Sequence, residues 1–356
     1  MEFISNRARK GRTARRVSVL AAAATAFALV ATGCATGSTG DSTDGAAADG
    51  DLSITFIPKQ LNNPYTDVVL GGGEDGAKEA GFASTQVVGP LEASASSQVS
   101  FINAETQAGT NVIVIAANDP DAVGPALQEA RDAGAKIVAF DSDTNPKYRD
   151  VFISQVVAKD VALIQTKLIS EQIGGKGEIA ILSATANATN QNEWIKFMEE
   201  ELASNPDYKD IKLVAKVYGD DDDTKSFQEA QGLLQAYPNL KGIISPTTVG
   251  IAATARYLST SDYKGKVMLT GLGLPNEMRP FVKDGTVTAF ALWDPAQLGY
   301  VAAFAGKALV DGDITGKEGD TFTAGEMGER TVGKDGIVIV GPPTTFDKNN
   351  IDEYDF

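Results

Sequence analysis

Polar and aromatic side chains follow several of the apolar runs in this chain, and their types suit the binding of a neutral polyhydroxy molecule. Asp141 directly follows the apolar run VAF, and an ionised carboxylate can accept hydrogen bonds from two hydroxyl groups at once. Trp and Tyr rings can pack on the C–H face of a sugar. The candidate ligand-binding residues are Lys59, Asn63, Tyr65, Asn118, Asp119, Asp141, Asn190, Gln191, Trp194, Pro246, Thr248, Trp293 and Asp294.

Residues of these types at a strand end are, taken one at a time, more often ordinary turn or helix-cap residues than ligand contacts. Lys59 could be a solvated surface charge, or it could pair with Asp141 or Asp294. The recurrence of such side chains at six predicted strand ends favours one shared site. In open α/β sheets, ligands bind just beyond the carboxyl ends of the strands.

The composition excludes several classes of chemistry. The chain has no histidine and a single cysteine, which removes the catalytic triads that need histidine and the usual zinc ligand sets. Its 47 acidic and 31 basic residues give a net charge of −16, which disfavours a nucleic-acid partner. We therefore expect no metal and no cofactor. A glycosidase that uses Asp141 and Asp294 as its carboxylate pair stays open.

The acidic run Asp220–Asp223 lacks the glycine and the glutamate that a calcium loop of the EF-hand type requires. We interpret it as a solvated turn. The glycines at 71–73 match no phosphate-binding fingerprint, and we expect them to permit close packing of a helix.

The amino terminus has the pattern of an export signal. Basic residues at 7–16 precede an apolar run at 17–31, which is too short to span a bilayer comfortably. Small residues then lead to Cys34, as in the lipobox of bacterial lipoproteins; a plain secretory signal is the alternative. We expect a lipoprotein signal peptide at 1–33, lipidation of Cys34, and a flexible tether at 34–50 that is rich in Gly, Ser, Thr, Ala and Asp.

Predicted strands and helices alternate along the rest of the chain. Strands are expected at 52–58, 86–89, 111–116, 136–140, 152–155, 177–182, 212–218, 242–245, 266–270 and 286–293. Most of these strands are separated by segments with helical spacing, such as 66–80, 121–133, 191–203 and 296–310. This alternation is typical of an α/β fold with doubly wound parallel sheets, and the length allows two such lobes.

Several long segments resemble one family closely. The runs FIPKQLNNPY, AANDPDAV, AFDSDTNP, SATANATNQNEW and ALWDPAQLGY resemble the substrate-binding proteins of sugar ABC importers, in particular the rhamnose-binding and autoinducer-2-binding proteins. The resemblance implies a periplasmic binding protein fold of type I, with two lobes joined by a three-crossover hinge. The lobes expected from it are 51–156 plus 288–312, and 157–287 plus 313–356.

The same resemblance implies a binding role rather than an enzymatic one. Lys59, Asp141, Gln191 and Pro246 match ligand-contacting positions of the autoinducer-2 proteins. Asn190 and Thr248 depart from them and match the rhamnose branch. We therefore expect a deoxy sugar such as L-rhamnose, with an autoinducer-2 receptor as the alternative.

The implied partners are a sugar, the permease subunits of an ABC importer and, through the lipid anchor, the outer face of the cell membrane. We expect a monomer. A sugar-responsive repressor of the same fold is disfavoured, because the chain has an export signal and lacks a basic helix-turn-helix.

Overall fold

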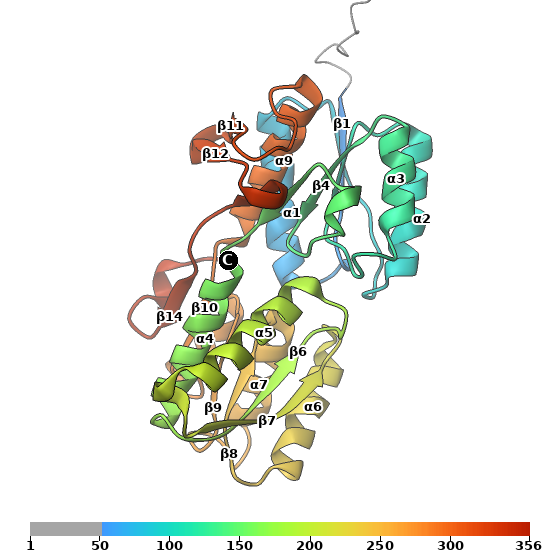
Figure 1. The fold of residues 1–356 in the computed structure, drawn as a ribbon. Coiled ribbons are helices and arrows are strands. Elements are labelled where there is room, and N and C mark those ends of the chain that lie inside the picture. The colour runs from blue at the N-terminus through green and yellow to red at the C-terminus, as the bar shows by residue number, and fades with distance from the viewer. Residues whose placement is uncertain (1–51) are drawn as a thin grey trace, which may run out of the picture. The chain divides into compact units, whose positions relative to one another are not determined.

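A computed structural model describes residues 52–356, and the export signal, Cys34 and the tether lie outside the described residues. The first lobe is organised around a six-stranded sheet in the order β13-β5-β4-β3-β1-β2, in which every neighbouring pair is parallel. Its strands are β1 (Ser53–Ile57), β2 (Ser84–Val87), β3 (Val112–Ile115), β4 (Lys136–Phe140), β5 (Val151–Ser154) and β13 (Ile337–Ile339) (Figure 1).

Both faces of this sheet are covered by helices, which explains why its central strands are apolar throughout. Val112 and Val114 of β3 pack in one core with helices α1 (Pro64–Glu79) and α9 (Pro295–Asp311). Ile113 and Ile115 face the other way, toward α2 (Ala95–Ala108) and α3 (Gly124–Asp132). Side chains of a strand alternate between faces, so one strand serves both cores.

Helices α1 and α9 approach each other unusually closely. A Cβ atom added to Gly72 would lie 2.0 Å from the carbonyl oxygen of Ala296, and one added to Gly299 would lie 2.0 Å from that of Val69. Gly73 similarly makes room for the ring of Phe56. The expectation that the glycine run permits close packing is confirmed for Gly72 and Gly73, whereas Gly71 has open space around it.

The second lobe has a four-stranded parallel sheet in the order β7-β6-β8-β9. A parallel bridge between Leu272 and Ala291 links it to β10, which pairs antiparallel with β14. Its strands are β6 (Gly177–Ser183), β7 (Ile211–Tyr218), β8 (Leu240–Ser245), β9 (Met268–Gly271), β10 (Ala289–Leu292) and β14 (Thr344–Asp347). Its helices are α4 (Ala158–Ile173), α5 (Thr189–Ser204), α6 (Asp223–Ala236), α7 (Thr248–Ser259) and α8 (Pro275–Lys283).

The chain passes between the lobes three times, after β5, after β10 and after β13. This confirms two parallel-sheet lobes joined by three crossovers. The remaining elements are a short hairpin, β11 (Thr321–Thr323) and β12 (Glu329–Thr331), and five single turns of 3₁₀ helix, at Pro146–Tyr148, Pro206–Tyr208, Gly325–Met327, Lys334–Gly336 and Ile351–Glu353. No helix in residues 52–356 is long and apolar enough to cross a bilayer.

The lobe boundaries in the last third of the chain differ from the expected ones. β10 belongs to the second lobe, where Phe290 stacks on Phe346 with ring centroids 5.3 Å apart. The segment that follows α9 stays in the first lobe through β13, because β13 pairs with β5 as the edge strand of the sheet and Val338 adds to the first-lobe core. Only the residues after β13 return to the second lobe. A three-residue strand gives too short a periodic signal to be assigned to either sheet.

Some element ends also differ from the expected ones. α1 begins at Pro64, with the Asn63 side chain accepting hydrogen bonds from the next two free backbone N–H groups. α3 begins at Gly124 rather than at 121, because Asp119 accepts from the backbone of Asp121 and Ala122 and holds them in a turn. Helix ends depend on such local bonds, which periodicity does not report.

Candidate functional site

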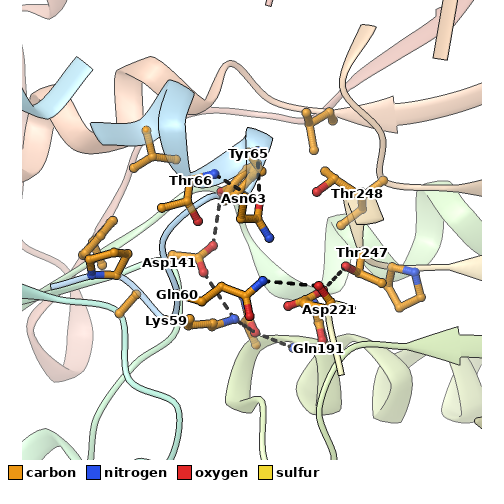
Figure 2. Close-up of a pocket in the computed structure, with 18 of the residues that line it drawn as sticks. Lys59, Gln60, Asn63, Tyr65, Thr66, Asp141, Gln191, Asp221, Thr247 and Thr248 are labelled. Atoms are coloured by element: carbon orange, nitrogen blue, oxygen red, sulfur yellow. Dashed lines mark hydrogen bonds and ion pairs between the residues drawn. The ribbon is translucent and has the colours of Figure 1, made fainter. Parts of the chain in front are cut away.

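A cavity lies between the two lobes at the carboxyl ends of their strands. Its volume is about 620 Å³ with its opening to solvent included. Its walls are Pro58, Lys59, Gln60, Asn63, Tyr65, Thr66, Val69, Ala116, Phe140 and Asp141 from the first lobe, and Asn190, Gln191, Trp194, Asp221, Pro246, Thr247, Thr248, Leu272, Leu292 and Trp293 from the second lobe and its crossover. Figure 2 shows the polar members converging on a shared space.

Asp141 is held at the end of β4 in a strained turn. Its φ of 58° is in the left-handed region, and the N–H of Ser142 donates to the carbonyl of Phe140 at 2.6 Å. A γ-turn with positive φ at its centre is uncommon, and such strain gathers at functional sites. The turn directs the carboxylate to three donors: Lys59 Nζ at 3.3 Å, Tyr65 Oη at 3.1 Å and Gln155 Nε2 at 3.3 Å.

Of the alternatives for Lys59, the structure supports the pair with Asp141. The ammonium is also 3.4 Å from Asn190 Oδ1, so it joins groups from both lobes. Both side chains of the ion pair are largely buried, at 13% and 11% exposure. Losing one partner would leave the other charge poorly compensated, which is far more costly than losing a surface pair.

Three aromatic rings form one wall of the cavity. The Trp293 ring lies edge-on to Tyr65 at 6.1 Å and to Trp194 at 5.8 Å between centroids. Trp293 Nε1 donates to Tyr65 Oη at 3.1 Å, and that hydroxyl in turn donates to Asp141. Burial and the nearby Asp141 carboxylate raise the pKa of Tyr65, so the phenol remains a donor. This wall combines apolar ring surface with an oriented carboxylate.

The first turn of α5 supplies two amides. Asn190 Oδ1 accepts from the backbone N–H of Gln191 at 2.9 Å. Gln191 Oε1 accepts from the N–H of Ala184 at 3.2 Å and from Ser183 Oγ at 3.4 Å, which orients its amide. The NH₂ group of Gln191 has no hydrogen bond within residues 52–356. It is therefore a donor that a ligand could use.

Three of the expected site residues do not line the cavity. Asn118 donates to the backbone carbonyl of Lys59 at 2.8 Å and thereby supports the loop that carries it. Asp119 closes the turn before α3 and accepts from Asn187 of the second lobe at 3.3 Å. Asp294 is the N-cap of α9 and accepts from the N–H of Ala296 at 3.0 Å. Asp119 is thus a turn residue and Asp294 a helix cap, whereas Asn118 supports the Lys59 loop.

Asp294 and Asp141 therefore do not form a carboxylate pair in one chamber. A glycosidase that uses those two residues has no support in the structure, because the two carboxyl groups must flank one glycosidic bond. Among the described residues, no cluster of three or more potential metal ligands is present.

Sequence reasoning missed the role of Asp221. The interpretation of 220–223 as a solvated turn is wrong for this residue, which lines the cavity and accepts a hydrogen bond from Thr247 Oγ1. The backbone puts it there: Asp220 and Asp221 both have positive φ, at 55° and 52°. Nothing in a run of four aspartates shows which one faces a cavity. Gln60 was also missed, and it donates to the backbone carbonyl of Asp221 at 3.2 Å.

Comparison with known proteins decides the family. Residues 54–314 match the periplasmic binding protein domain. The chain belongs to the periplasmic binding protein family. Among curated proteins, the D-apiose import binding protein of Actinobacillus succinogenes is 27% identical over 72% of this chain and 82% of its own length.

Solved structures of this family are similar over nearly their full length. A sugar ABC transporter protein from Actinomyces odontolyticus is 70% identical, covers 88% of this chain and 100% of its own, and has a TM-score of 0.71. A solute-binding protein from Clostridium phytofermentas with bound L-rhamnose is 36% identical, covers 85% of this chain and 98% of its own, and has a TM-score of 0.81. The LsrB protein of Clostridium saccharobutylicum, in complex with AI-2, is 26% identical, covers 86% of this chain and 100% of its own, and has a TM-score of 0.81.

The protein is thus a substrate-binding component of a sugar ABC importer and acts outside the cytoplasm. Its relatives are transport proteins rather than enzymes. Its ligand is a sugar and its partner a permease.

Proposed function

We propose that this periplasmic binding protein captures a neutral deoxyhexose, with L-rhamnose as the first candidate. The observation that carries the proposal is the division of the cavity into two kinds of wall. Polar groups gather at Lys59, Asp141 and the amides of α5. The apolar side chains that line the cavity include Val69, Ala116, Phe140, Leu272 and Leu292. A deoxyhexose has a matching division between its hydroxyl groups and its methyl group.

The relatives support this choice of ligand. The solute-binding protein with bound L-rhamnose is more similar in sequence than the one with AI-2, at 36% against 26%. The two positions at which this chain departs from the autoinducer-2 proteins, Asn190 and Thr248, both line the cavity. Autoinducer-2 remains the second candidate, because Lys59, Asp141, Gln191 and Pro246 line the same cavity.

The proposed mechanism is capture by lobe closure. Residues from both lobes line the cavity, so a ligand that bonds to both stabilises the closed arrangement over the open one. The permease then receives the closed, loaded form. Hydrogen bonds outside the cavity already connect the lobes, such as Ser142 Oγ to Thr189 Oγ1 at 2.9 Å.

The test is calorimetric titration of the purified protein with L-rhamnose, L-mannose, D-ribose and autoinducer-2. L-Mannose differs from L-rhamnose only by a hydroxyl group on C6, so this pair probes the apolar wall. We expect L-rhamnose to bind roughly 10- to 100-fold more tightly, the range that an apolar pocket achieves against one added hydroxyl. Equal affinities for the two sugars, or tight binding of autoinducer-2 alone, would contradict the assignment.

A further inference from the structure

Asp221 differs from the other three acids of its turn. Asp220 pairs with Lys225, Asp222 caps α6 by accepting from the N–H of Lys225 at 2.7 Å, and Asp223 makes a two-bond pair with Arg256 at 2.7 and 2.8 Å. Asp221 alone among the four lines the cavity. Its partners are instead Thr247 of the same lobe and Gln60 of the opposite lobe.

The turn that carries Asp221 is held from several sides. Two successive non-glycine residues with positive φ are strained, and such strain persists only where the surroundings impose it. The N–H of Asp220 donates to the carbonyl of Ala184 at 3.1 Å, and the N–H of Asp222 donates to that of Gly219 at 2.9 Å. Gly219 packs so closely on Ser226 that an added Cβ would lie 2.1 Å from its hydroxyl. The position of the carboxylate is therefore built into the fold.

One of the two carboxylate oxygens remains available. Thr247 donates to Oδ1, whereas Oδ2 has no hydrogen-bond partner within residues 52–356. Figure 2 shows Asp141 and Asp221 entering from different lobes, with Lys59 and Gln60 nearby. Burial and the Asp141 carboxylate raise the pKa of Asp221, while the Lys59 ammonium and the Thr247 hydrogen bond lower it. Ionisation of the Asp221 carboxyl group therefore costs free energy unless a hydrogen-bond donor or a positive charge compensates it.

We propose that Asp221 is a second ligand-contacting carboxylate, which together with Asp141 makes this site select neutral sugars over sugar acids. Asp141, Asp221 and Lys59 are the charged side chains among the described cavity walls, so the lining has an excess of negative charge. A hydroxyl group can donate to Asp221 Oδ2, whereas the carboxylate of a sugar acid would be a third anion beside one ammonium. This inference rests on the proposed function, since it specifies the ligand class of the same cavity.

The experiment compares Asp221→Asn with Asp220→Asn in the full-length protein. Asparagine tolerates positive φ well, so both variants keep the turn and each removes one charge. Calorimetry with L-rhamnose and with its acid, L-rhamnonate, gives the two affinities. The two tryptophans of the chain both line the cavity, so tryptophan fluorescence provides an independent binding signal.

We expect the wild-type protein to bind L-rhamnose and to show no measurable binding of L-rhamnonate. Asp221→Asn should weaken the binding of L-rhamnose roughly 10- to 100-fold, which is the loss expected for a hydrogen bond to a charged group. It should also reduce the difference in affinity between L-rhamnose and L-rhamnonate. The affinity of Asp220→Asn for L-rhamnose should stay within about twofold of the wild-type value, because the charge of Asp220 lies outside the cavity.

Affinity for L-rhamnose within twofold of wild type in Asp221→Asn, with the discrimination unchanged, would overturn the assignment while leaving the proposed function in place. A wild-type protein that binds none of the neutral sugars contradicts the proposed function itself, and Asp221 then loses this role with it. If the wild type prefers D-ribose to L-rhamnose, the same comparison is made with D-ribose and D-ribonate.

Discussion

At the scale of single residues, we expect sugar binding to depend most on Asp141. It receives donors from Lys59, Tyr65 and Gln155, and its backbone is strained. We expect Asp141→Asn to weaken sugar binding at least 100-fold, because the charge that orders these donors is lost. Asparagine tolerates the positive φ, so the variant should fold, with a stability loss of about 3–5 kcal/mol from the unpaired Lys59.

The matched control is Asp294→Asn, the same change at the other predicted carboxylate. Asparagine caps helices about as well as aspartate, so α9 should be unaffected. Calorimetry should give wild-type affinity, because Asp294 lies outside the cavity. Equal losses in the two variants would show that the cavity is assigned to the wrong residues.

The pKa of Asp221 leads to a prediction about stability rather than binding. Burial raises this pKa above its value in the unfolded chain, with Asp141 and Asp220 adding to the rise and Lys59 and Thr247 opposing it. The ionised form is therefore disfavoured in the folded state, so the group begins to destabilise the fold as pH rises through its unfolded pKa and does so fully above its folded pKa. Below the unfolded pKa, near 4, both states are protonated and this effect is absent.

We accordingly expect Asp221→Asn to raise the melting temperature of the ligand-free protein at pH 7, and the rise to vanish toward pH 3.5. Thermal unfolding of both proteins at the two pH values measures this. A lower melting temperature for the variant at pH 7 would mean that the carboxylate stabilises the fold. If Asp221→Asn both stabilises the fold and weakens sugar binding, the carboxylate at this position serves binding at a cost in stability.

At the scale of elements, the contact between α1 and α9 positions one side of the site, since α1 carries Tyr65 and α9 begins next to Trp293. Gly72→Ala would place a Cβ 2.0 Å from a backbone oxygen that can move only with its helix. We expect a stability loss of about 1–3 kcal/mol, as for other overpacked contacts. Denaturant unfolding measures it.

Gly71→Ala is the control for that variant, because it is the preceding residue of the same helix and has nothing within 4 Å of the added Cβ. Alanine is the better helix former, so this change should stabilise the protein by about 0.5–1 kcal/mol. Opposite signs at adjacent positions would identify interhelical packing as the cause. Changes of the same sign in the free energy of unfolding at both positions would indicate an effect of helix propensity alone.

At the scale of the whole molecule, we expect hydrogen bonds outside the cavity to influence the equilibrium between open and closed lobes. Thr189 Oγ1 contacts Ser142 Oγ at 2.9 Å and donates to the carbonyl of Asp143 at 3.3 Å, both across the lobes. Thr189→Val should weaken sugar binding by about 2- to 10-fold, although the residue does not line the cavity, because the closed form loses stability.

The kinetics of Thr189→Val distinguish closure from direct contact. Stopped-flow tryptophan fluorescence should show an unchanged association rate and faster dissociation, since the cross-lobe bonds form after capture. An unchanged dissociation rate would mean that these bonds do not favour the closed form.

The membrane anchor at Cys34 stays a prediction. If Cys34 is lipidated, the wild-type protein should partition with membranes and Cys34→Ser should be released into the soluble fraction. Immunoblotting of the two fractions measures this. Release of the wild-type protein with a plain secretory cleavage would support the alternative export signal.

The sequence by itself determined the fold class and most of the cavity, because both rest on local patterns, whereas the two lobes and their three crossovers were implied by the resemblance to a known family. Strand periodicity, the polar residue after each strand and the general rule for parallel sheets together located Lys59, Asp141, Asn190, Gln191 and Trp293. Ten of the thirteen expected residues line the cavity, so the remaining three show the limit of that rule. A polar residue at a strand end can equally complete a turn, as Asp119 does, or cap a helix, as Asp294 does.

Only the tertiary structure decided which aspartate of the run at 220–223 faces the cavity and to which lobe β10 and β13 belong. Both outcomes depend on interactions distant in sequence. Asp221 is directed by two left-handed residues and by Thr247 and Gln60, while β13 is placed by pairing with β5, almost two hundred residues earlier. The energy of such contacts exists only once the partners meet, so no local pattern in the chain encodes it.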